Sequence, residues 1–79
     1  MLKELQSGNK VSGAKQSRRA IRDGLAERVY LAGDADAALT DPLRLFCLEN
    51  GVPVVDQYSM RELGRACGIA VGAAVAAEL

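Results

Sequence analysis

Short runs of β-branched or aromatic residues alternate with helix-forming segments along this chain, and this alternation restricts the fold more than any other feature. The clearest strands are expected at 28–32 and 52–55, each bordered by a glycine. Strands alternating with short helices predict an α/β protein, a three-layer α/β/α sandwich around a small mixed sheet of about four strands. The other expected elements are a short helix at 2–5, strands at 11–13 and 72–77, a loop at 34–41, and helices at 14–23, 43–48 and 60–67.

Residues with special backbone properties mark several ends of these elements. Ser59 and Glu62 stand three residues apart, the spacing of a capping box, and predict that a helix begins directly after Ser59. Gly24 predicts the end of the helix at 14–23, because glycine readily adopts the left-handed conformation that terminates helices. Pro53 has no backbone N–H, which places it at a sheet edge or at the first position of its strand.

The 79 residues are expected to form one domain, residues 1–79, with a modest core. A chain of this length buries only about 60% of the surface that its unfolded form exposes. We expect a single core between the sheet and its helices. Its apolar members are predicted to be Ile21, Val29, Leu31, Leu45, Leu48, Val54, Leu63 and Val75.

Charge is distributed unevenly although the formal net charge is zero. Residues 1–22 hold six basic side chains against Glu4 alone, a sum of +5, and residues 23–79 hold four basic against nine acidic ones, a sum of −5. Because affinity for a polyanion follows the local field at the docking face, the basic N-terminal quarter is a candidate nucleic-acid surface. The alternative is a run of solvated charges without a partner.

Metal binding, a cofactor and a membrane span are all poorly supported by the composition. The chain has no histidine and only two cysteines, Cys47 and Cys67, which cannot complete a zinc site and are expected to be small core residues in a reducing compartment. The apolar stretch at 66–77 is shorter than the roughly 20 residues that cross a bilayer. No signal peptide is recognisable at the N-terminus. We therefore expect a soluble, cytoplasmic protein without a metal or cofactor.

Catalysis is also poorly supported. Asp34 and Asp36 follow a predicted strand, as the nucleophile and acid of aspartyl-phosphate phosphatases do, but Ala38 stands where that pattern requires Thr or Val. There is no histidine to act as a base near neutral pH, and no glycine-rich phosphate-binding motif is present. The sequence therefore predicts a protein that is not an enzyme.

The strongest binding signal lies where a strand meets a helix, at Gly13. Lys15, Gln16 and Arg19 follow it over the first two helical turns, with Arg19 one turn after Lys15 on the same face. Free amides at a helix N-terminus attract phosphate, and long polar side chains there can reach base edges. The alternative is a solvent-exposed amphipathic helix preceded by a glycine.

Four segments in order resemble the kink-turn-binding ribosomal proteins of the L7Ae/L30e family, above all its short bacterial members. They are 13–19, with its Gly-Ala-Lys-Gln-Ser-Arg-Arg sequence, and 31–36, 51–54 and 59–68, and together they span most of residues 11–77. The resemblance implies an α/β/α sandwich that binds kink-turns, bent helix-bulge-helix RNA elements with tandem sheared G·A pairs. It also implies a monomer that takes part in translation, with ribosomal RNA as one candidate target.

The resemblance assigns RNA contacts to eight residues. It gives Gly13 a backbone contact, Lys15 and Gln16 the guanine edges, Arg19 a guanine or phosphate, Asp36 a flipped-out nucleotide, and Ile69, Ala70 and Val71 an apolar loop over the bulge. Ala70 is a departure, since relatives often carry Glu at that position. A module of the same fold that binds a protein partner through the apolar loop remains an alternative. Because a protein-binding descendant has no need of Lys15, Gln16 and Arg19 together, RNA binding is favoured.

Overall fold

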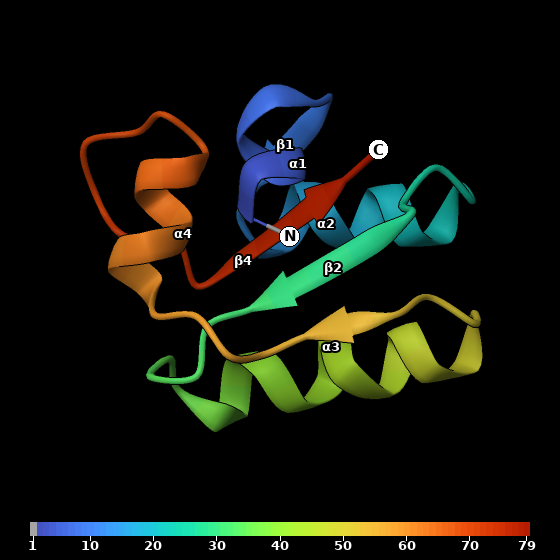
Figure 1. The fold of residues 1–79 in the computed structure, drawn as a ribbon. Helices are drawn as coiled ribbons and strands as arrows, with labels where there is room; N and C mark the ends of the chain where they lie inside the picture. Colours follow the sequence, from blue (N-terminus) through green and yellow to red (C-terminus); the bar gives the residue numbers. More distant parts are fainter. Residues whose placement is uncertain (1) are drawn as a thin grey trace.

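The computed structural model describes residues 2–79, which form four helices and a four-stranded sheet (Figure 1). None of the helices in this part of the chain is long and apolar enough to cross a membrane. The elements in chain order are α1 (Leu2–Ser7), β1 (Lys10–Ser12), α2 (Ala14–Arg22), β2 (Arg28–Leu31), α3 (Ala37–Glu49), β3 (Val54–Val55), α4 (Met60–Ala66) and β4 (Val75–Glu78).

The sheet is mixed, with the strand order β1-β4-β2-β3. The inner strand β4 pairs antiparallel with both β1 and β2, and β3 pairs parallel with β2 at the edge. β3 begins only after Pro53, whose carbonyl accepts a hydrogen bond from the Val29 amide at 3.0 Å. The edge position that Pro53 predicts is therefore confirmed, since a residue without an N–H can accept from the neighbouring strand but cannot donate to it.

Two helices cover each face of the sheet, which confirms the three-layer sandwich. Successive side chains of a strand point to opposite faces. Accordingly, Val29 and Leu31 pack with α2 and α3, whereas Tyr30 and Ala32 pack with α1 and α4. Figure 1 shows α3 along one side of the strands and α4 at the left end of the molecule.

The expectation of one core that includes Leu45 and Leu48 is wrong. The buried apolar residues form two clusters, one on each face of the sheet, and Leu63 lies in the cluster on the opposite face from Leu31. Leu45 is 57% exposed and Leu48 76% exposed. Because each helical residue turns by about 100°, the face of α3 that buries Leu43 and Cys47 turns these two leucines toward solvent.

Local signals located several element ends correctly. Ser59 and Glu62 form the expected capping box at the start of α4, and Gly24 has a φ of +73° directly after α2. The helix α3, in contrast, begins at Ala37 inside the expected loop, because the Asp36 side chain accepts a hydrogen bond from the Ala38 amide and caps it. The last strand begins at residue 75 rather than 72.

Candidate functional site

The topology brings four connecting segments to one end of the sheet, and three of them concern the candidate residues. Ser12 lies opposite Ala76 and Leu31 opposite Val75, so β1 and β2 end where β4 begins. The segments that follow β1 and β2 and the segment that precedes β4 therefore leave the sheet together, on the left in Figure 1. We call this the loop end of the sheet. All eight residues to which RNA contacts were assigned lie in these three segments or in the first turns of α2.

Gly13 connects β1 to α2 in a conformation that favours glycine. Its φ is +95°, and a Cβ built there would meet nothing within 4 Å, so the backbone angle and not crowding explains the residue. Its amide donates to the Val75 carbonyl at 2.8 Å, and its carbonyl accepts from the Ser17 amide at 3.0 Å. No side chain caps α2, so the amides at 14–16 precede the first helical hydrogen bond and are available to an anion.

The outer face of α2 is basic. Lys15, Gln16 and Arg19 are exposed, and neither Lys15 nor Arg19 forms an ion pair with a carboxylate within residues 2–79. Arg18 differs, because its guanidinium lies 4.8 Å from the centre of the Phe46 ring on α3, a cation–π contact. A hollow of about 400 Å³ runs beside this face and is lined by Lys15, Arg18, Arg19, Arg22 and Phe46.

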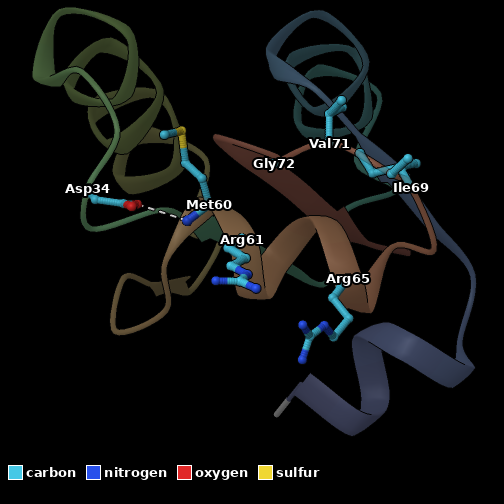
Figure 2. Close-up of a pocket in the computed structure, with 8 residues that line it drawn as sticks. Asp34, Met60, Arg61, Arg65, Ile69, Val71 and Gly72 are labelled. Atoms are coloured by element: carbon cyan, nitrogen blue, oxygen red, sulfur yellow. Dashed lines mark hydrogen bonds between the residues drawn. The ribbon is translucent and has the colours of Figure 1, made fainter.

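Two aspartates in the loop between β2 and α3 accept backbone hydrogen bonds that stabilise the fold. Asp36 caps α3 with Oδ1, which accepts from the Ala38 amide at 2.9 Å. Asp34 Oδ1 accepts from the Met60 amide at 2.8 Å and so ties this loop to the start of α4 (Figure 2). Helix capping alone therefore explains an acidic residue at position 36, and its side chain remains exposed beside the other segments.

The loop at 68–74 exposes apolar side chains, and its backbone is hydrogen-bonded to α4. Ile69 is 39% exposed and Val71 71% exposed. The Ile69 amide donates to the Gly64 carbonyl at 3.0 Å, and the Ala73 amide donates to the Met60 carbonyl at 2.9 Å. A Cβ on Gly64 would overlap the Val71 carbonyl oxygen, so only glycine allows the loop to lie against α4.

A second hollow, which we call the α4 hollow, was not anticipated. It measures about 580 Å³ and is lined by Asp34, Met60, Arg61, Arg65, Ile69, Ala70, Val71 and Gly72 (Figure 2). Arg61 and Arg65 were not among the residues predicted to contact RNA. Their spacing of one helical turn was a signal that they share a face, but nothing local connects that face with the 68–74 loop.

Neither cysteine lines either of the two hollows. Cys47 is fully buried and Cys67 partly buried, and both are free thiols. Burial raises the pKa of each thiol above its ordinary value, which disfavours the reactive thiolate. This matches their expected role as small core residues. Among the residues that the structure describes, no group of three or more His, Cys, Asp or Glu side chains is placed to hold a metal ion.

The model of the ribosomal protein L7Ae/L30e/S12e/Gadd45 family matches residues 1–79. The chain belongs to this family. It is 45% identical over 75 residues to an RNA-binding protein of Geobacillus sp. (strain WCH70), covering 95% of this chain and 92% of that protein. It is 44% identical over 77 residues to the RNA-binding protein YbxF of Geobacillus stearothermophilus, covering 98% of this chain and 94% of YbxF.

A solved structure of an RNA-binding protein has a similar fold. The 15.5kD RNA binding protein of Giardia lamblia superposes with a TM-score of 0.90 at 34% identity, over 98% of this chain and 68% of that chain. The resemblance to the short bacterial members of the family is thereby confirmed. The family is named for ribosomal proteins, and the matched relatives are named RNA-binding proteins and not enzymes, which confirms the prediction of a protein that is not an enzyme.

Proposed function

We propose that this protein binds structured RNA of the kink-turn type at the loop end of the sheet. The observation that carries the proposal is the placement of two complementary surfaces side by side. The start of α2 offers exposed Lys15 and Arg19, which have no carboxylate partner within residues 2–79, and the 68–74 loop offers exposed Ile69 and Val71. The Gly13–Val75 hydrogen bond holds the two segments together. Support also comes from the family and from relatives that are named RNA-binding proteins.

The start of α2 is suited to an exposed base-pair edge next to a phosphate. Free amides after Gly13 attract a phosphate oxygen, while Lys15 and Gln16 extend from the first turn toward bases. Bidentate contacts from such side chains to guanine or adenine edges distinguish bases. A sheared G·A pair presents edges that an ordinary A-form helix keeps inside a deep, narrow groove. Arg19, one turn further on, then lies against guanine or the backbone.

The apolar loop is suited to bases that have left the stack. Ile69, Ala70 and Val71 project no charge, so they can cover the faces of unpaired bases at a bulge. Asp36 lies in the neighbouring loop and offers a carboxylate oxygen to a base that has flipped out. We further propose a cytoplasmic monomer, with ribosomal RNA as one candidate target, because the family is one of ribosomal proteins.

A second candidate function is binding of a protein partner through the same loop. The exposed Ile69 and Val71 side chains favour it, since an apolar surface of this kind also suits a protein interface. The exposed charges of Lys15 and Arg19 argue against it, because the cores of protein interfaces are depleted of charge. We therefore place RNA binding first.

A gel-shift titration tests the proposal. The unmutated protein is titrated against a kink-turn RNA and against a control in which the sheared G·A pairs are replaced by Watson–Crick pairs. Tighter binding of the kink-turn is expected, because only that RNA presents the edges and the bulge. Equal affinity for the two RNAs would contradict kink-turn recognition. Failure of the folded protein to bind either RNA would leave the protein-binding alternative.

A further inference from the structure

We propose that Arg61 and Arg65 of α4 bind the phosphodiester backbone of the RNA in the α4 hollow, so that the RNA contacts both sides of the 68–74 loop. This inference rests on the proposed function and extends it to two residues that sequence reasoning had left out. It gives the interface a second basic surface, separate from that of α2.

The two arginines share one face of α4. They lie one helical turn apart, both are exposed, and both line the α4 hollow together with the apolar loop. Figure 2 shows them leaving the same side of α4, with Ile69 and Val71 above the helix in that view. The hollow thus combines two cationic groups and the Asp34 carboxylate, which accepts from the Met60 amide, with an apolar wall.

The charges of the two guanidinium groups are not compensated by an ion pair within residues 2–79. No carboxylate among residues 2–79 forms an ion pair with Arg61 or Arg65, whereas Arg28 pairs with Glu78 and Arg44 with Asp56. The neighbouring acids have other partners. Asp34 accepts from the Met60 amide, and Glu62 accepts from the Ser59 amide within the capping box. The two arginines are therefore free to bind an external anion.

The composition of the hollow favours a nucleic acid over a small anion. An arginine guanidinium donates two parallel hydrogen bonds to phosphate oxygens, which suits a phosphodiester. The wall formed by Ile69, Ala70 and Val71 carries only apolar side chains, which suit the face of a base or the carbon surface of a sugar. A strand of RNA supplies both kinds of surface at once.

The salt dependence of RNA affinity tests the inference. Each phosphate neutralised by a side chain adds about 0.7–0.9 to the slope of log K against log salt concentration. If Lys15, Arg18, Arg19 and Arg22 were the only contacts, a slope of roughly −2 to −4 would be expected. Dissociation constants for a kink-turn RNA are measured over a KCl series for the unmutated protein, for Arg61→Gln, for Arg65→Gln and for the double variant.

We expect the slope to become shallower by about 1 for each arginine replaced and the double variant to bind about tenfold more weakly at low salt. The double variant Arg61→Lys/Arg65→Lys should keep the slope and lose part of the affinity, because lysine retains the charge without the bidentate geometry. Arg44→Gln is the matched control, since it removes the same charge from an arginine that is paired with Asp56 outside the hollow. Thermal melting verifies that every variant is folded.

The possible outcomes are distinguishable. An unchanged dissociation constant and slope in the double glutamine variant, alongside a preference of the unmutated protein for the kink-turn, would overturn this inference and leave the proposed function standing. An equal change in Arg44→Gln would also overturn it, because net charge alone would then explain the effect. If the unmutated protein does not prefer the kink-turn over its control, the proposed function and this inference both fail.

Discussion

Two groups of charged residues, one at each end of the sheet, differ in their partners. At the end away from the loops, Glu78 is only 9% exposed, accepts a hydrogen bond from the Tyr30 hydroxyl at 2.9 Å and pairs with Arg28 at 3.3 Å. At the loop end, Lys15 and Arg19 are exposed and have no carboxylate partner within residues 2–79. The Glu78 and Arg28 side chains bind each other across β2 and β4, whereas Lys15 and Arg19 are available to a ligand.

This difference predicts that one group of charged residues contributes to the stability of the fold and the other to ligand binding. A partly buried ion pair with a hydrogen-bonded tyrosine is costly to break, because its polar groups would be left without partners. Burial accordingly raises the pKa of Tyr30 above its ordinary value and keeps its hydroxyl protonated as a donor. Solvated side chains at the loop end contribute little to folding. Substitutions away from the loops should therefore change the free energy of unfolding, and those at the loop end should change affinity.

The largest effect on stability is expected for a substitution in the buried interior of the protein. Leu31 is fully buried on the inner strand β2. The substitution Leu31→Ala should lower the free energy of unfolding by about 2–5 kcal/mol, because it removes apolar contacts and leaves a cavity. Chemical denaturation measures this change. An unchanged midpoint with the same cooperativity would show that this strand is not central to the core.

Gly64→Ala tests whether stability and binding are fully separate at the loop end. The new Cβ would overlap the Val71 carbonyl oxygen, so the 68–74 loop must move away from α4. Affinity for the kink-turn RNA should fall while duplex affinity changes little, and overpacking should cost about 1–3 kcal/mol of stability. Gly24→Ala is the control, since it strains a positive φ of +73° in the turn after α2 and should leave affinity unchanged. Equal losses of affinity in both variants would contradict a specific role for the loop.

Gln16→Ala is expected to act on binding alone. If Gln16 contacts a guanine edge of a sheared pair, the substitution should cost about 1–3 kcal/mol of affinity on a kink-turn. It should cost far less on a duplex of equal length, which does not present that edge. Because Gln16 is exposed, thermal stability should stay the same. Parallel titrations with the two RNAs provide the comparison, and equal losses on both would remove the base-reading role.

Glu78→Gln should show the reverse pattern. Glutamine keeps the size of the side chain and an oxygen for the Tyr30 hydroxyl, but it loses the charge that pairs with Arg28. We expect a loss of about 1–2 kcal/mol in the free energy of unfolding and no change in RNA affinity. Denaturation curves and one titration check both expectations. A clear loss of affinity without a loss of stability would break the comparison between the two ends.

The smallest effect is expected for Arg18→Ala. Arg18 contributes one positive charge, and its guanidinium lies over the Phe46 ring of α3, so we expect it to contact a phosphate and not a base. Its loss should weaken kink-turn and duplex binding similarly and by less than about 1 kcal/mol. A phosphate contact fixes the position of the protein on the RNA but does not distinguish one base from another. A selective loss on the kink-turn, seen in the same titrations, would instead give Arg18 a base-reading role.

The sequence determined those features that depend on a few neighbouring residues. The capping box of Ser59 and Glu62, the turn at Gly24 and the edge position of Pro53 all followed from backbone chemistry. The alternation of strands and helices was sufficient for the three-layer fold. The family resemblance placed the candidate residues, from Gly13 on α2 to Val71 in the last loop, and their part in RNA binding stays a prediction.

The tertiary structure decided which surfaces face each other. Leu48 sits in an apolar stretch of the sequence, yet the orientation of α3 against the sheet leaves it exposed. In the sequence, Arg65 cannot be distinguished from an ordinary surface arginine. In the structure, it lines a hollow together with the 68–74 loop, which can pack against α4 because Gly64 has no Cβ. The physical reason is the same in both cases. Capping and turns involve residues a few positions apart, whereas burial and shared hollows arise from contacts between segments that only the folded chain brings together.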